Sequence, residues 1–230
     1  MSFTERTVAR WSVIHVDGEM GAHGTQHPNP DCRGFYHVMA RGNRREKIFA
    51  DDDDRRFFLG ILAEACGMTG WRVHAWVLMG NHYHLFIETP EANLVQGMQW
   101  LQNAYTRRFN VRHRKWGRLF GDRYSRAERD SLPQAARRAR AVARGNAVIV
   151  EGSAGDYYRT LMDYIHLNPV RARIIEPRGG QSVMDYPWSS VAGGYALPAS
   201  RRAKWLAAGH GLGVMAPRRV VRVFGLKPLA

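Results

Sequence analysis

The protein has 230 residues, with 34 Lys and Arg against 20 Asp and Glu, a net charge of +14 and a pI near 10.5. Hydrophobic residues make up 45% of the sequence and aromatic residues 11%, which excludes a wholly disordered chain. No apolar run approaches the roughly 20 residues that cross a bilayer, and the first residues lack signal-peptide features, so we expect no membrane protein. Two isolated cysteines, Cys32 and Cys66, supply neither a disulfide framework nor a four-cysteine zinc site, which favours the reducing cytoplasm.

The first predicted elements follow a leader. Residues 1–33 mix Gly, His, Pro and Asn without periodicity and predict a flexible leader. Residues 35–42 are rich in β-favouring side chains and predict a strand, which the basic loop 41–47 follows. Four aspartates at 51–54 then precede apolar residues at helical spacing. Because carboxylates cap the free N–H groups of a helix start, we interpret these aspartates as a cap and not as a metal cluster.

The middle of the chain predicts a hairpin and a second helix. Two β-rich segments, 71–79 and 82–88, flank the turn residues Gly80 and Asn81 and predict an antiparallel hairpin. Apolar residues recur every three or four positions over 93–113, which predicts a helix.

The later elements are less regular. A loop or short strand is expected over 118–125, a basic helix over 132–145 and a strand over 146–150. A third amphipathic helix is expected over 156–168, ending at Asn168 because a residue before proline avoids the α-helical region.

The length of the chain favours one folded domain with extensions. Strand, helix, hairpin, helix, strand and helix in succession indicate an α+β fold with a ferredoxin-like antiparallel sheet and helices packed on it.

Positive charge is concentrated between residues 103 and 145. This segment holds 13 Arg or Lys against three acidic residues, a net charge of +10, and aromatic residues interleave with the cations. Phosphates attract cations and unpaired bases stack on flat rings, so the pattern predicts a nucleic-acid partner. A solvated helix face with its aromatics in the core, or contact with an acidic membrane surface, would leave the same pattern.

Two groups of residues could perform chemistry. Period-two alternation places His82 and His84 on the same face of a strand, where two imidazoles could hold a divalent ion. Tyr164 and Asn168, four residues apart, share one flank of the third helix. If that flank meets the histidines, a cation with open positions and a phenolic nucleophile could cleave phosphodiesters. Each residue alone is more often structural, and an Asn before Pro commonly just ends a helix.

Six segments, in chain order, resemble one family. They read FYHVMARGNRREKIF, WVLMGNHYHLFIETP, LQNAYTRRFN, GRLFGDRY, DYIHLNPVRARII and DYPWSS. The chain from about Gly34 to Tyr195 is similar to the REP-associated tyrosine transposases, relatives of the single-tyrosine HUH transposases of bacterial insertion sequences. The resemblance implies an HUH-type domain over 34–195, followed by a basic tail over 196–230. It also implies an endonuclease and strand transferase that acts on single-stranded DNA with hairpin or palindromic repeats.

The resemblance also implies roles for individual residues. His82, His84 and Asn168 would bind Mg²⁺ or Mn²⁺, and Tyr164 would attack DNA to leave a 5′-phosphotyrosine and a free 3′-OH. The basic loop after the first strand would read DNA. The candidates for DNA contact are Arg41, Asn43, Arg44, Arg45, Arg107, Arg108 and Arg123. The arginine-rich insertion over 125–145 and the leader depart from the family pattern. The protein is expected to act in the cytoplasm, associated with the nucleoid, as a monomer or a homodimer.

Two other functions remain open. The protein could bind structured nucleic acid without cleaving it, using the histidines only for structure. A zinc hydrolase is less well supported because no H-E-x-x-H motif occurs and the candidate ligands mix Asn with His.

Overall fold

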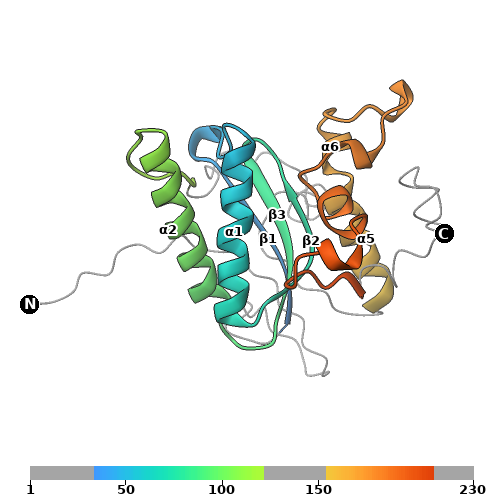
Figure 1. Ribbon diagram of the computed structural model, residues 1–230, viewed down its shortest axis with the longest axis horizontal. Helices are drawn as coiled ribbons and strands as arrows, with labels where there is room; N and C mark the ends of the chain where they lie inside the picture. Colours follow the sequence, from blue (N-terminus) through green and yellow to red (C-terminus); the bar gives the residue numbers. More distant parts are fainter. Residues whose placement is uncertain (1–33, 122–153, 210–230) are drawn as a thin grey trace, which may run out of the picture.

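The computed structural model describes residues 34–121 and 154–209. Three strands, β1 (Gly34–Arg41), β2 (Arg72–Leu78) and β3 (His82–Thr89), form an antiparallel sheet in the order β1-β3-β2. The helices are α1 (Asp52–Thr69), α2 (Leu94–Arg112), α5 (Ala154–His166) and the short α6 (Asn168–Arg171). Figure 1 shows α1 and α2 side by side on one face of the sheet and α5 on the other. The predicted α+β class, with helices packed on an antiparallel sheet, is confirmed.

The alternation of side chains along β3 separates these two faces. Tyr83 points toward α1 and α2: its ring lies 4.7 Å from that of Phe58, and its hydroxyl accepts a hydrogen bond from Gln102 Nε2 at 2.9 Å. The neighbouring His84 instead contacts Tyr164 of α5, with ring centroids 5.5 Å apart. Successive side chains of a strand leave its opposite faces, so one strand contributes to both layers.

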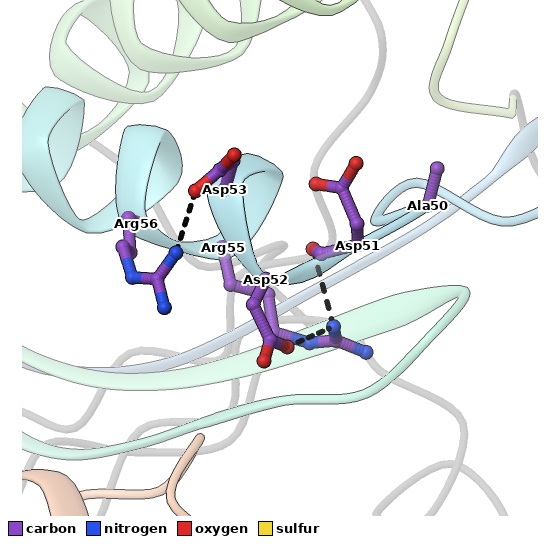
Figure 2. Close-up of a pocket in the computed structure, with 6 residues that line it drawn as sticks. All are labelled: Ala50, Asp51, Asp52, Asp53, Arg55 and Arg56. Carbon is purple, nitrogen blue, oxygen red and sulfur yellow. Dashed lines mark hydrogen bonds and ion pairs between the residues drawn. The ribbon is translucent and has the colours of Figure 1, made fainter.

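The four aspartates form the start of α1, as predicted, and one of them caps it. Asp51 is the N-cap residue, and its side chain accepts a hydrogen bond from Asp54 N at 3.0 Å. Figure 2 shows the open pocket at this helix start, where Arg55 contacts Asp52 and Arg56 contacts Asp53.

This acidic turn is joined to the end of α2. Asp54 is buried and accepts hydrogen bonds from Arg112 at 2.6 Å and from His113 at 2.9 Å. The hydrogen bond from Arg112 also lowers the pKa of Asp51 to about 2. These partners satisfy the carboxylates within the fold, so the aspartates serve structure.

The chain after α6 packs along the outer edge of β2. Leu78 N donates to Trp188 O, and Val73 N donates to Trp205 O, both at 2.9 Å. Residues up to Ala208 therefore continue the packed structure past position 195, and they cover backbone groups that an edge strand would otherwise expose.

The third helix differs from its prediction at one end. The helix α5 ends at His166, and Asn168 begins α6 instead of ending the preceding helix. Proline is compatible with the first turn of a helix, so Pro169 allows a new helix to start where the old one stops. The predicted leader, the basic helix over 132–145 and the strand over 146–150 lie outside the described residues. Among the helices that are described, none is long and apolar enough to cross a membrane.

Candidate active site

The two histidines of β3 lie together on the face that α5 covers. Their ring centroids are 5.2 Å apart and the rings are nearly perpendicular, at 83°. His84 is buried, with 1% of its surface exposed, whereas His82 is partly exposed at the end of the strand. The short distance between the two rings shows that both side chains lie on the same face of the strand.

Hydrogen bonds fix one nitrogen of each ring. His82 Nδ1 lies 2.7 Å from Asn81 Oδ1, and because that carbonyl oxygen can only accept, Nδ1 carries the proton. His84 Nδ1 lies 2.9 Å from His37 Nε2. The Nε2 atom of each ring is then the nitrogen that could bind a ligand.

Burial keeps both rings neutral. It lowers the pKa of His82 to about 4, with a further contribution from the positive charge of Arg41. It also lowers the pKa of His84 well below 6.5, and His37, His82 and Arg41 add to this effect. At neutral pH both imidazoles therefore have lone pairs available for a cation.

The tyrosine of α5 packs against this histidine group. The Tyr164 ring lies 5.5 Å from His84 and 5.8 Å from His37, centroid to centroid, edge to face in both cases. The fold thus brings together two side chains that are 80 positions apart in the sequence.

Asn168 is held beside the tyrosine by a backbone contact. Its Nδ2 donates a hydrogen bond to the Tyr164 carbonyl oxygen at 2.9 Å. Because that contact uses the amide nitrogen, the Oδ1 atom is the one that could bind a cation. This hydrogen bond fixes Asn168 relative to the backbone of α5, which carries Tyr164.

Two arginines act on the Tyr164 hydroxyl. Burial raises its pKa, whereas the charges of Arg171 and Arg41 and a hydrogen bond from Asn168 lower it. The guanidinium of Arg171 lies 4.7 Å from the centre of the Tyr164 ring. Because burial outweighs these effects, the phenol is protonated at neutral pH and needs further positive charge or a base to become a nucleophile.

Sequence analysis missed two residues of this group, His37 and Arg171. Helical spacing could have indicated Arg171, since it follows Tyr164 by seven positions, although the chain changes from α5 to α6 between the two residues. Nothing local indicates His37. It meets His84 only through the pairing of β1 with β3, across 47 positions.

Polar contacts at two further points hold α5 on the sheet. The Tyr158 hydroxyl lies 2.7 Å from His74 Nδ1, and His74 Nε2 lies 3.1 Å from Glu88 Oε2. At the other end of the helix, His166 Nε2 lies 2.7 Å from the hydroxyl of Ser190. These buried contacts fix the helix, and therefore the position of Tyr164.

A β-bulge places His74 in that network. The register of β2 against β3 shifts between Val73 and Ala75, so His74 is the extra residue. A bulge re-aims side chains locally, and here the imidazole faces α5.

The predicted DNA-binding residues occupy three places. Arg41 pairs with His82 in the β1-β3 register and adjoins the candidate site. Asn43, Arg44 and Arg45 form an exposed turn directly after it. Gly42 is required for this turn, since a Cβ there would lie 2.1 Å from the Glu46 carbonyl oxygen.

The remaining predicted residues lie elsewhere. Arg107 and Arg108 are exposed on α2, which covers the opposite face of the sheet from α5, and Arg108 lies 3.7 Å from Glu64 of α1. Arg123 is outside the described residues.

The side chains that could hold a metal ion are mixed in type. Within residues 34–121 and 154–209, no group of three or more His, Cys, Asp or Glu has an arrangement suited to a metal. A ligand set here would therefore consist of the two imidazoles and the Asn168 amide oxygen.

Comparison with known proteins identifies a related family. The family model described as "Transposase IS200 like" matches residues 33–133, a segment that contains His82 and His84. The resemblance to the tyrosine transposases is thereby confirmed. The match indicates a DNA-processing role of the transposase type. It does not extend to Tyr164 or Asn168, whose positions rest on the structure alone.

Other comparisons add less. A search of curated proteins finds no match. The solved structures that match include a REP-associated tyrosine transposase bound to a REP hairpin. It has 15% sequence identity and a TM-score of 0.48 and covers 74% of this chain and 82% of that one.

Proposed function

We propose that this transposase-like protein is a metal-dependent single-strand DNA endonuclease and strand transferase that uses Tyr164 as its nucleophile. Its substrate is DNA that forms a hairpin, cut in the unpaired strand. The observation that carries the proposal is the packing of the Tyr164 ring against His84, at 5.5 Å between centroids. A phenol and two neutral imidazoles, next to arginines, make up a phosphodiester-cleaving group.

The reaction is an exchange of phosphodiester bonds. The Tyr164 oxygen attacks the scissile phosphorus, the bond from phosphorus to O3′ breaks, and DNA is left joined to the tyrosine through its 5′ phosphate. The phenol loses a proton to solvent and the leaving O3′ gains one, so the step needs no oxidant or external energy. Attack by a second 3′-OH reverses the chemistry and joins strands, releasing the tyrosine.

The residues around Tyr164 prepare it for this step. Arg171 and Arg41 favour the phenolate and can receive the non-bridging phosphate oxygens. The contact of Tyr158 with His74 keeps α5 from rotating, so the phenol stays beside the imidazoles.

The donor set is consistent with a divalent cation. His82 Nε2, His84 Nε2 and Asn168 Oδ1 would hold it, and its positive charge would lower the pKa of the phenol and neutralise the phosphate. Two imidazoles suit Mn²⁺ better than Mg²⁺, which prefers oxygen ligands.

An adduct assay tests the proposal. A hairpin oligonucleotide with single-stranded flanks, labelled at either its 5′ or its 3′ end, is incubated with the protein and Mn²⁺. We expect the 3′ label to migrate with the protein under denaturing conditions and the 5′ label to leave on a shortened strand. Peptide mapping of the adduct should identify Tyr164.

The same assay distinguishes the alternative function. Tight binding with neither adduct nor cleavage, at any concentration of Mn²⁺ or Mg²⁺, would identify a non-catalytic DNA-binding protein. An adduct on a different tyrosine would keep the reaction class and remove the assignment of Tyr164.

A further inference from the structure

The loop after α2 exposes an aromatic side chain almost completely. Trp116 has 91% of its surface accessible to solvent. The other aromatics that precede it in the basic segment, Tyr105 and Phe109, are buried at 1% and 3%. Large aromatic side chains usually bury most of their area, so an exposed indole with cations beside it is a candidate contact for a partner.

Hydrogen bonds define the loop that presents this indole. Lys115 N donates to Asn110 O at 2.8 Å, and Asn110 Nδ2 donates to Gly117 O at 2.9 Å. Gly117 adopts a φ of +92°, which other residues rarely reach. Trp116 is therefore held between two anchored neighbours.

The loop that carries the indole has charges of one sign. Arg114, Lys115 and Arg118 are all exposed, and the sequence from Asn110 to Gly121 contains no acidic residue. An exposed aromatic among cations is the combination that binds single-stranded nucleic acid, because bases stack on the ring while phosphates meet the charges.

The loop is connected directly to the candidate active site. Asn43 N donates to Leu119 O at 2.9 Å, and Gly121 N donates to Arg41 O at 3.0 Å. Arg41 in turn pairs with His82 across the sheet. The backbone thus connects the loop of Trp116, through the turn that holds Arg44 and Arg45, to the strand ends at Arg41 and His82.

We propose that Trp116 stacks on an unpaired base of the DNA strand that flanks the hairpin, while Arg114, Lys115 and Arg118 bind the neighbouring phosphates. The identity of the partner rests on the proposed function. This base-stacking contact lies outside the cleavage site. It holds the single strand so that the scissile phosphate reaches Tyr164. The contact does not select one kind of base, since every base has a flat face that can stack on the indole.

Binding measurements test the inference. The probe is a fluorescent hairpin with a single-stranded flank, and its dissociation constant is measured by anisotropy for the wild type, Trp116→Ala and Trp116→Phe. We expect Trp116→Ala to bind roughly 5- to 100-fold more weakly, the loss of one stacked base. Trp116→Phe should retain most of the affinity. Val111→Ala, which changes a neighbouring side chain that is 76% exposed, is the matched control and should bind as the wild type does.

A second set of probes locates the base. Each carries one abasic position in the flank. The probe that lacks the stacked base should bind the wild type more weakly than the intact probe does. The same probe should bind Trp116→Ala as well as the intact probe does. If Trp116→Ala binds every probe as the wild type does, the inference is wrong, and adduct formation by both proteins would leave the proposed function intact. If the Trp116 effect is present but no adduct forms, the catalytic proposal fails and the stacking site stands. Absence of all binding to the probes by the wild type would overturn both.

Discussion

The two faces of the sheet carry different kinds of side chain although the same strands build both. Toward α1 and α2, the core is aromatic and apolar: Phe58 packs on Tyr83 and lies 5.2 Å from Tyr105. Toward α5, the strands present His37, His74 and His84, and each has a polar partner. The first face buries apolar area, and the second holds polar groups in fixed geometry.

This difference separates stability from chemistry. Burial of apolar area is the main driving force of folding, and the α1 and α2 face supplies much of it. Buried imidazoles and phenols add little to stability unless their hydrogen bonds are satisfied, and their value lies in orientation. Substitutions on the first face should therefore change mainly the free energy of unfolding, whereas substitution of Tyr164 or of the histidines beside it on the second face should change catalysis.

The sharpest test compares two tyrosines of α5. In Tyr164→Phe, adduct formation should fall by more than about 1,000-fold, because the nucleophilic oxygen is lost. In Tyr158→Phe, the free energy of unfolding should fall by about 1 to 3 kcal/mol, because His74 loses a buried partner. Adduct formation per folded molecule should fall far less in that variant, because the contact of His166 with Ser190 still holds α5. The reverse pattern, with Tyr158 essential and Tyr164 dispensable, would assign the nucleophile to the other ring.

The opposite face should respond in stability. Phe58→Ala removes a fully buried ring from between Phe49 and Tyr83 and should lower the free energy of unfolding by about 3 to 5 kcal/mol. Urea denaturation measures this change, and the adduct rate is then measured where both proteins are folded. An adduct rate that falls with no loss of stability would contradict the separation of the two faces.

Sequence patterns predicted the elements well because those patterns are local. Alternation along 71–79 and 82–88 predicted the hairpin, and helical spacing predicted α1 and α2. The shared face of His82 and His84 follows from the same alternation. The carboxylates at 51–54 were also interpreted correctly, since a capping contact spans only three residues.

Contacts between distant elements could not be predicted in this way. The approach of Tyr164 to His84 depends on how α5 packs on the sheet. The sequence alone does not show whether the two residues meet. His37 depends on the β1-β3 register, and the orientation of His74 depends on a bulge. The predicted end of α5 is wrong because the chain starts a second helix at Asn168. Pro169 is compatible with that start but does not require it.

His37 provides a finer test of the chemical face. Its Nε2 lies 2.9 Å from His84 Nδ1, so it is a positioning residue that orients the ring through the nitrogen opposite the proposed metal ligand. His37→Phe should weaken the apparent affinity for Mn²⁺ by about 10- to 100-fold, and excess Mn²⁺ should restore adduct formation. His74→Phe is the matched control: it alters a buried histidine of the same face and should reduce stability with an unchanged Mn²⁺ dependence. Equal Mn²⁺ dependence in the two variants would remove the role of His37.

The smallest expected effect concerns the basic turn at the end of β1. Replacing Arg44 and Arg45 with Gln should weaken hairpin binding and flatten its dependence on salt, because fewer counterions are released from the DNA. The slope of log affinity against log salt should change by about 0.7 for each single-strand phosphate that the variant no longer neutralises. Arg56→Gln is the control, since this exposed arginine is already paired with Asp53 on α1 and should leave the slope unchanged. A slope that stays the same in the Arg44 and Arg45 variant would place the DNA away from this turn, and it would also break the proposed path between Trp116 and the imidazoles.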